Sequence, residues 1–317
     1  MKLPVSWLRE FVDAPEDPTR LGEALTMVGF ALEGMEGEGD EAVLDLDVTT
    51  NRVDAMNVYG LAREVAVIYG RPLKPLELGF TEGGDDASTV LEVSIEAPDL
   101  CPRFAARVLD VTPGPSPDWM QKRLEQVGVR PINNIVDLSN YVMLEMGHPS
   151  HAFDLARIPS GRLNVRWAKD GEELRTLDEV DRGLTPRCGV VAGAEGALAL
   201  AGIMGGASSE VSDDTRTIAL EAAYWDPLII RRAAKALAMH TEASHRFERG
   251  ADPQGPPVAI ARVAHLLERI GAGTTRPGFI DVIPEALGRR QVGFRAARAS
   301  AILGAEVPAA RCAEILE

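Results

Sequence analysis

The sequence predicts an α+β protein in which short strands and helices occupy largely separate stretches of the chain. Apolar and polar residues alternate at 44–48, which is typical of a half-buried strand, and segment 104–111 also has the composition of a strand. Helical spacing of apolar residues is clearest elsewhere, in 226–239 and 256–271. Because strands and helices do not alternate regularly, we expect a mixed sheet with segregated helices rather than a doubly wound parallel sheet.

Residues 1–75 are expected to form a small N-terminal α/β domain. Ser6 is a candidate N-cap for a first helix, and Gly29 is expected to end a second one. The alternation at 44–48 predicts a half-buried strand. A further helix follows it and is expected to stop at Gly70.

Two further parts are expected after this domain. Residues 76–287 are predicted to form a mixed-sheet domain, entered through the turn-rich linker 81–90. Residues 288–317 carry two helical patterns and stop inside an apolar one. We therefore expect this last part to be an incomplete helical stub, the start of a truncated unit.

Composition and missing motifs exclude several classes of protein. The chain is 45% hydrophobic and 26% charged, as in a folded globular protein. It has no apolar run of the roughly 20 residues that span a bilayer, so no membrane is expected. Three widely spaced cysteines form neither a disulfide framework nor a metal motif, which predicts a reducing, cytoplasmic location. The GxxxxGK[ST], GxGxxG and GxSxG patterns are absent, so nucleotide and serine-hydrolase chemistry have no sequence support.

Charge is unevenly distributed along the chain. The formal net charge of −15 argues against nucleic-acid binding by the whole surface. Residues 1–221 hold 20 Lys and Arg against 38 Asp and Glu, whereas residues 222–317 hold 13 against 10. Contact with a polyanion is therefore expected to use the second part.

Two histidines, His148 and His151, occur three residues apart in GHPSHAFDL, a spacing that could serve a metal, a proton transfer or no function at all. A structural zinc normally needs four ligands and a catalytic zinc three. The nearest cysteine, Cys188, is 37 residues from His151, and the chain has no HExxH or CxxC motif. We therefore expect no metal at these histidines.

Glu221 interrupts an otherwise apolar strand-like run, TIALEAAY. On a half-exposed strand its side chain would simply face water. On an internal strand the carboxylate would need hydrogen-bond donors or a shifted pKa, and it would be an acceptor waiting for a ligand. The pattern alone leaves both interpretations open.

Three other segments carry polar or small residues in unusual density. Residues 200–210 concentrate glycine and alanine, as in a tight turn or a backbone-lined pocket. Asn133, Asn134, Ser139 and Asn140 add neutral hydrogen-bonding groups, which in most proteins cap turns. The charged residues of 241–250 favour a structural ion-pair network over a direct site.

Long stretches of the chain resemble one family, in the family order. They are LPVSWLREFV, LDVTTNRVDAMNVYGLAREVA, RPINNIVDLSNYVMLEMGHPSHAFDL, LALAGIMGGASSEVSDDT and IALEAAYWDPLIIRRAAKALAMHTEASHRFERGADP, followed by an arginine-rich tail. From residue 3 to about residue 312, the chain thus resembles the β subunit of bacterial phenylalanyl-tRNA synthetase. Each stretch is long and unusual, so the resemblance is specific.

Two departures from this family are large. In most members an oligonucleotide-binding-like (OB) tRNA domain is inserted where this chain has only EGMEGEGDEAV. The chain also stops before the family's catalytic-like module, its anticodon-binding module and most of a helical (B5-type) module. The resemblance therefore implies a small domain at 1–75, a B3/B4-type editing domain at 76–287, and the start of a B5-type domain at 288–317.

The resemblance implies hydrolytic editing of tyrosine wrongly attached to phenylalanine tRNA. Glu221 matches the family's glutamate that binds the tyrosine phenol. His151 matches its editing-site histidine and is the expected catalytic residue, whereas His148 falls where the family commonly has glutamine. Ser139 and Asn140 match the family's polar pair. The small residues lining the amino-acid pocket correspond to Ala201 and Gly202.

Partners and cofactors are also implied only by the resemblance. The family enzyme is a heterotetramer of two α and two β chains that binds tRNA(Phe) and uses ATP and Mg²⁺ for aminoacylation. No cofactor is expected in the present residues, which should not aminoacylate by themselves. Two alternatives are a freestanding hydrolase that clears mischarged tRNA in trans and a non-catalytic module that binds tRNA or a subunit. Because phosphate contacts carry much of nucleic-acid affinity, we expect the isolated chain to bind tRNA weakly.

Overall fold

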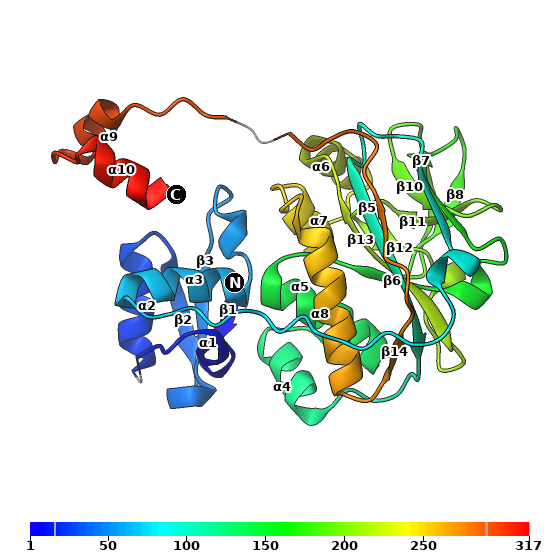
Figure 1. Ribbon diagram of the computed structural model, residues 1–317, viewed down its shortest axis with the longest axis horizontal. Coiled ribbons are helices and arrows are strands. Elements are labelled where there is room, and N and C mark those ends of the chain that lie inside the picture. The colour runs from blue at the N-terminus through cyan, green and yellow to red at the C-terminus, as the bar shows by residue number, and fades with distance from the viewer. Residues whose placement is uncertain (16, 289–290, 317) are drawn as a thin grey trace. The chain divides into compact units, whose positions relative to one another are not determined.

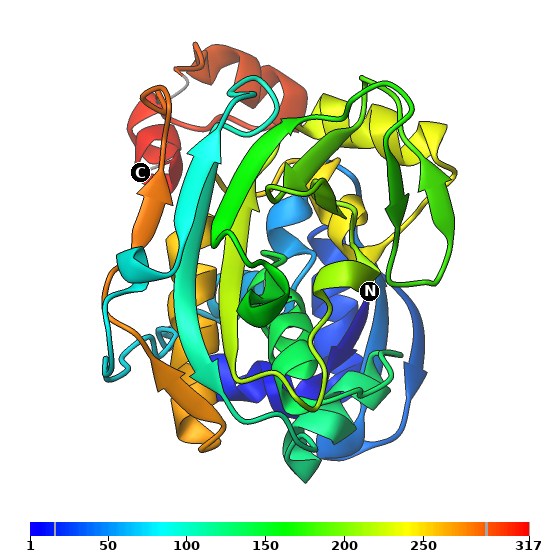
Figure 2. The same ribbon diagram turned by 90° about the vertical axis from the view of Figure 1, so that its right-hand side faces the viewer.

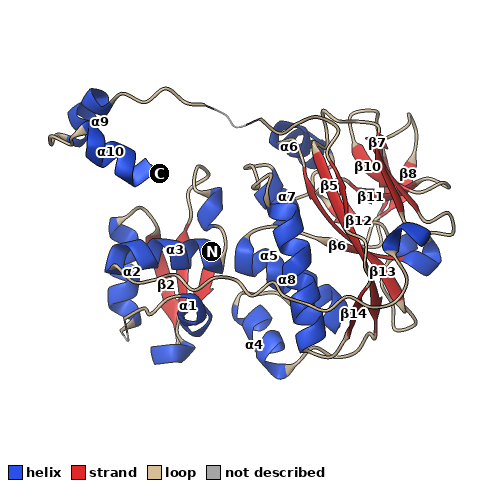
Figure 3. Cartoon of the chain, viewed as in Figure 1, coloured by secondary structure: helices blue, strands red, loops and turns tan. Residues whose placement is uncertain are grey.

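The computed structural model describes residues 1–15, 17–288 and 291–316 and confirms the α+β class (Figure 1 and Figure 3). The chain forms two compact units, Met1–Glu285 and Ala286–Glu317. The domain boundaries expected at 75/76 and 287/288 stay predictions. No described helix combines the length and the apolar composition needed to cross a bilayer.

The first part of the larger unit is a three-stranded antiparallel sheet with helices. Strand β3 (Val43–Asp47) lies between β1 (Lys2–Pro4) and β2 (Ala31–Glu36). Leu44 and Leu46 on β3 are fully buried, as their alternation predicts. Helices α1 (Val5–Phe11), α2 (Pro18–Met27) and α3 (Val58–Tyr69) supply the other apolar side chains of this core. The expected helix end at Gly70 is confirmed, because Gly70 caps α3 in the left-handed conformation.

The expectation that Ser6 caps α1 is wrong. The helix begins one residue earlier, at Val5, and its N-cap Pro4 makes no side-chain capping bond. Strand β1 runs directly into the helix, and the Val5 N–H donates to the Ala42 carbonyl at 2.9 Å. A backbone acceptor from a neighbouring segment thus takes the role that a capping hydroxyl would have had.

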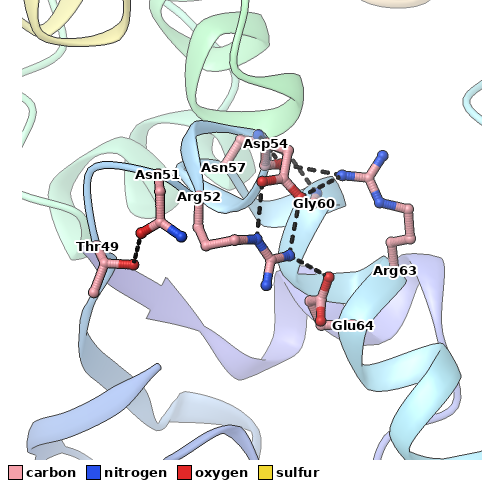
Figure 4. A network of polar contacts seen from close by, with 8 residues as sticks. All are labelled: Thr49, Asn51, Arg52, Asp54, Asn57, Gly60, Arg63 and Glu64. Carbon is pink, nitrogen blue, oxygen red and sulfur yellow. Dashed lines mark hydrogen bonds and ion pairs between the residues drawn. The ribbon is translucent and has the colours of Figure 1, made fainter. Parts of the chain in front are cut away.

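Ion pairs order the loop between β3 and α3 (Figure 4). Arg52 Nη2 lies 3.0 Å from Asp54 Oδ2 and 2.5 Å from Glu64 Oε1, and Arg63 also contacts Asp54. Hydrogen bonding from Arg52 is the main cause that lowers the pKa of Asp54. A Cβ at Gly60 would lie 2.9 Å from the Asp54 carbonyl carbon, so the loop packs closely against the start of α3.

Two five-stranded sheets form the rest of the larger unit (Figure 1 and Figure 2). The first has the order β14-β5-β13-β6, with β15 also paired to β5. The second has the order β12-β11-β10-β7-β4 and is mixed, because β4 and β7 are parallel. Their strands are β4 (Glu92–Ile95), β5 (Arg103–Val111), β6 (His151–Asp154), β7 (Arg162–Trp167), β10 (Gly189–Ala192), β11 (Ala197–Leu200), β12 (Met204–Gly205), β13 (Thr217–Tyr224), β14 (Gly273–Thr275) and β15 (Ile280–Val282). A separate hairpin pairs β8 (Glu173–Arg175) with β9 (Asp181–Gly183).

The two faces of β13 belong to different cores. Ile218, Leu220 and Ala222 pack in the core that also contains the apolar side chains of α5 and α8. Ala219 and Ala223, on the other face, pack in the core between the two five-stranded sheets. Because side chains alternate along a strand, Glu221 shares the face of Ala219 and Ala223.

Helices pack against both of these cores. Buried side chains of α4 (Asp118–Gln126), α5 (Asn134–Met146) and α8 (Gly255–Arg269) belong to the first core, and those of α6 (Pro227–Ala236) and α7 (Glu242–Phe247) belong to the second. Buried Arg262 on α8 donates to buried Glu145 on α5 through Nε at 2.7 Å and Nη2 at 2.8 Å. This two-bond pair satisfies both charges inside the helical layer.

The smaller unit contains α9 (Ala296–Leu303) and α10 (Ala309–Leu316), as the two helical patterns predict. Residues 289–290 and 317 of the expected stub lie outside the described residues. The large apolar side chains of the two helices are exposed: Ile302, Leu303, Ile315 and Leu316. Cys312 is buried within the unit.

Candidate active site

Strand pairing brings Glu221 and His151 directly opposite each other. Strand β13 lies between β5 and β6, and the register pairs Glu221 with Ala106 on one side and with His151 on the other. The strand of Glu221 is therefore internal. Of the two interpretations open from the sequence, the structure shows the buried one, with 7% of Glu221 exposed.

Burial controls the protonation of Glu221. The hydrogen bonds of the described residues include none to its carboxyl group, and burial raises its pKa to about 8. The nearby Cys101 thiol is also buried, and both burial and the Glu221 charge raise its pKa. Negative charge is thus disfavoured at this place, and Glu221 is mostly a neutral acid at pH 7. A neutral carboxyl group both donates and accepts a hydrogen bond.

His151 is a neutral imidazole with a free nitrogen. Burial lowers the pKa of His151 to about 4, so the ring carries no charge at pH 7. Its Nε2 atom is buried and has no hydrogen-bond partner among the described residues. The ring is held edge-on against Phe153, with centroids 4.5 Å apart. An unpaired buried nitrogen of this kind is costly and is available to a ligand or a water.

Two glycines let the backbone of the second sheet come close to this pair. A Cβ at Gly205 on β12 would lie 2.7 Å from His151 Nε2 and would overlap the ring. Gly202 has a φ of +64°, and its Cβ would lie 2.9 Å from the Trp225 ring. The close approach that the glycine-rich segment 200–210 predicts is therefore present at both positions.

A cavity of about 100 Å³ opens beside these side chains. Glu221, His151 and Ser150 supply polar groups to a wall that is otherwise mostly apolar, including Val191, Leu200, Ile203, Met204 and Trp225. A closed apolar cavity of roughly 150 Å³ is known to hold benzene. The present cavity is smaller, so an aromatic ring fits in it only if side chains of the wall move.

The other predicted site residues lie around the cavity in different ways. Gly202 lines it, whereas Ser139, Asn140 and Ala201 do not. Ser139 on α5 donates to the Ser150 carbonyl at 2.6 Å and lies 2.9 Å from the Ser150 hydroxyl, so it positions a residue of the wall. The Ala201 N–H donates to the Gly189 carbonyl at 3.0 Å behind the wall. Their assignment to the site stays a prediction.

Sequence reasoning missed the contribution of α7. Ala243 and Phe247 line the cavity, although their segment stands out in the sequence for its charges. Those charges form ion pairs, Arg246 with Glu242 and Arg249 with Glu248. The helical spacing of Ala243 and Phe247 places both on one face of α7, and this apolar pair is the signal that a search for charged groups overlooks.

Arg246 connects α7 to the N-terminal part of the chain. Its side chain is buried, and its Nη2 donates to the Met56 carbonyl at 3.2 Å. Met56 directly follows the loop that the Arg52 and Arg63 ion pairs order (Figure 4). The helix that closes the cavity is thus held by a part of the chain almost 200 residues earlier in the sequence.

His148 and His151 belong to different cavities. His148 lines a groove together with Asn57 and Gly255, and its ring lies edge-on to Phe247, with centroids 5.8 Å apart. Burial is the main cause that lowers its pKa, to about 4. Only His151 faces the cavity that contains Glu221.

One group of described side chains has the composition of a metal site. Ligand atoms of His240, His245 and Glu248 lie within 4.8 Å of one another. Each already has a protein partner, because His245 Nδ1 lies 3.1 Å from His240 Nε2 and Glu248 pairs with Arg249. We therefore assign no metal to this group.

Comparison with known proteins identifies the family. Residues 100–272 match the B3/4 domain. The chain belongs to the B3/4 domain family. The match covers β5 through α8, and so includes both strands that carry the paired Glu221 and His151.

Relatives of the chain carry the name phenylalanine–tRNA ligase β subunit. The protein of Rhodopirellula baltica is 41% identical over 311 residues, which are 98% of this chain and 46% of the relative. Those of Syntrophus aciditrophicus and Thermotoga maritima are each 44% identical, over 87% and 84% of this chain and about a third of each relative. These similarities confirm the family resemblance that the sequence motifs indicate. The chain spans a third to a half of the length of these relatives.

A solved structure is also similar over the whole chain. It is an N-terminal fragment of the phenylalanyl-tRNA synthetase β subunit from Pyrococcus horikoshii, of which 88% is covered, at 15% identity and a TM-score of 0.46.

Proposed function

We propose that this chain is the editing part of a phenylalanine–tRNA ligase β subunit and hydrolyses the ester of tyrosine wrongly attached to tRNA(Phe). The observation that carries the proposal is the pairing of Glu221 and His151 at one cavity. Glu221 and the Nε2 atom of His151 are buried, and the described residues satisfy neither Glu221 nor His151 Nε2 by a hydrogen bond. Such groups are expected where a ligand completes the hydrogen bonding.

Discrimination between tyrosine and phenylalanine is the physical reason for a second pocket. A hydrophobic pocket that binds phenylalanine rejects an added hydroxyl only weakly, on the order of 10². A pocket that hydrogen-bonds the hydroxyl rejects the analogue without it by roughly 10⁴–10⁵, because a buried polar group is then left unpaired. Glu221 is such a group, and the phenol O–H of tyrosine would donate to its carboxyl oxygen.

His151 is proposed to position the reacting ester or the attacking water. Its neutral ring can donate or accept through Nε2, which faces a cavity built around Gly205. Part of the proton transfer is assigned to the terminal ribose hydroxyl of the tRNA itself.

The remaining assignments concern the whole enzyme. We propose an α subunit and tRNA(Phe) as partners, in an assembly of two α and two β chains in the cytoplasm. ATP and Mg²⁺ would serve the synthetic reaction, which we place outside the present residues. The chain by itself is therefore expected to hydrolyse a mischarged ester and not to form one.

Hydrolysis of Tyr-tRNA(Phe) and Phe-tRNA(Phe) by the 317-residue protein tests this proposal. We expect release of tyrosine to be much faster than release of phenylalanine. The same measurement on a β chain of the relatives' full length that carries this segment, assembled with the α subunit, tests whether hydrolysis depends on parts that the present residues do not span. Absence of selective tyrosine release from both proteins would overturn the proposed function.

A further inference from the structure

Helix α6 presents a basic face to solvent. The segment from Pro227 to His240 contains three cations and no Asp or Glu, in a chain whose net charge is −15. The three cations are Arg231, Arg232 and Lys235, and all are exposed. Arg187, in the turn before β10, is exposed as well.

These four side chains differ from most other basic residues of the chain. In the described residues, 20 of the 31 Lys and Arg side chains lie in ion pairs with Asp or Glu, even on exposed surfaces such as that of Arg162 and Glu92. Arg187, Arg231, Arg232 and Lys235 lie in none of them. Lys235 is in the last turn of α6, where the helix dipole alone favours a cation. That explanation does not extend to the two arginines in the middle of the helix.

A cleft with an aromatic wall lies beside this basic face. It has a volume of about 660 Å³ and is lined by Arg187, Arg232, Trp167 and the apolar side of α6. Arginine and lysine bind phosphates, and an accessible aromatic ring stacks on an unpaired base. Together these groups have the composition of a surface that binds a single-stranded nucleic acid.

The same elements form the wall of the candidate active site. Ile230, on the buried side of α6, approaches Gly202: a Cβ atom added at Gly202 would lie 3.0 Å from Ile230 Cδ1. Cys188, which lines the cleft, directly precedes strand β10, and Val191 on β10 lines the cavity. Helix α6 thus carries the basic side chains on its exposed side and Ile230, which approaches the cavity-lining Gly202, on its buried side.

We propose that Arg187, Arg231, Arg232 and Lys235, together with Trp167, bind the single-stranded 3′ end of the tRNA next to the editing cavity. The proposal rests on the proposed function and names where its substrate is held. The net charge of −15 disfavours phosphate binding by most of the surface, and no tRNA-binding domain is inserted between β2 and β3. A short RNA end needs only a few phosphate contacts, which this surface supplies.

Binding of an uncharged RNA minihelix with an unpaired 3′ end tests this surface without any hydrolysis. The test variant is Arg231→Gln/Arg232→Gln/Lys235→Gln. The matched control is Lys74→Gln/Arg130→Gln/Arg269→Gln, which removes three exposed cations from other surfaces and gives the same net charge. Affinity is measured by fluorescence anisotropy over a series of salt concentrations, with a blunt-ended duplex as a second probe.

We expect the test variant to bind the minihelix roughly tenfold or more weakly at low salt, with the slope of log K against log salt reduced by about 2. The control triple should change both quantities little, and Trp167→Ala should weaken only the probe with the unpaired end. Equal loss in the two triples, or equal binding of the blunt duplex by the unmodified protein, would overturn the proposal. If the protein binds the RNA selectively but hydrolyses no ester, the result supports this RNA-binding surface and contradicts the proposed editing function.

Discussion

Burial determines the protonation state of Glu221, the residue proposed to bind the tyrosine hydroxyl. Glu221 lies on a strand between two others, no described residue donates a hydrogen bond to its carboxyl group, and burial keeps the acid protonated near neutral pH. The unfolded chain releases this proton near pH 4.5, while the folded chain keeps it until about pH 8. Between these two values the folded state binds one more proton than the unfolded state. Its free energy of unfolding therefore falls as pH rises.

Glu221→Gln removes this pH dependence. The variant has no proton to lose, so we expect its stability relative to the unmodified protein to increase between pH 5 and pH 8, on the order of 1 kcal/mol per pH unit. Urea unfolding at a series of pH values measures the difference, and Glu173→Gln on an exposed part of β8 serves as the control. A difference that stays constant with pH would contradict the burial argument.

His151→Ala is expected to slow hydrolysis of the tyrosyl ester roughly a hundredfold. Because burial lowers the pKa of His151 to about 4, the rate of the unmodified protein should show no step near pH 6.5 from this residue. Single-turnover deacylation over a range of pH tests both statements. Normal deacylation by the variant would exclude any essential role for the side chain.

The two key side chains could be singled out from the sequence, but their surroundings could not. Glu221 stands out because a carboxylate interrupts an apolar strand. Whether it faces water or a core depends on the second sheet, which the alternation of one strand does not describe. Phe247 reaches the cavity through the tertiary packing of α7, a helix distant from His151 in the sequence, and only its helical spacing from Ala243 marks that face.

At the scale of elements, the site depends on how closely β12 approaches β6. Gly205→Ala would place a methyl group against the His151 ring and the Leu177 side chain, 2.7 Å from His151 Nε2 and 3.0 Å from Leu177 Cδ1. We expect loss of tyrosyl-ester hydrolysis by at least tenfold with the fold retained. Gly183→Ala on β9 is a matched control, because nothing lies within 4 Å of its Cβ position. Equal activity of the two variants would show that the ring position is unimportant.

The presence of helices and strands was predicted better than the residues at which they begin and end. Helix α3 and strand β3 lie where periodicity places them, because both bury one regular face. The start of α1 was misplaced, since its first N–H is satisfied by Ala42 from another segment rather than by Ser6. The role of α7 was also missed, because its charges pair with one another while its small apolar face closes the cavity.

At the scale of the whole molecule, the unit Met1–Glu285 contains the complete candidate site. The unit Ala286–Glu317 buries one side chain among its described residues, Cys312, and leaves large apolar side chains exposed. A chain that ends after Glu285 is therefore expected to unfold at the same temperature and to hydrolyse the tyrosyl ester at the same rate. Calorimetry and a deacylation assay test this, and loss of the folding transition would contradict it.

The ratio of kcat/KM for Tyr-tRNA(Phe) over Phe-tRNA(Phe), in the unmodified protein and in Glu221→Ala, tests most directly whether Glu221 reads the phenol hydroxyl. We expect a large preference for the tyrosyl ester in the unmodified protein and a fall in that ratio of about a hundredfold or more in the variant, because the buried partner of the hydroxyl is gone. The rate with the phenylalanyl ester should change much less. An unchanged ratio would show that another group recognises the hydroxyl and would contradict the role given to Glu221.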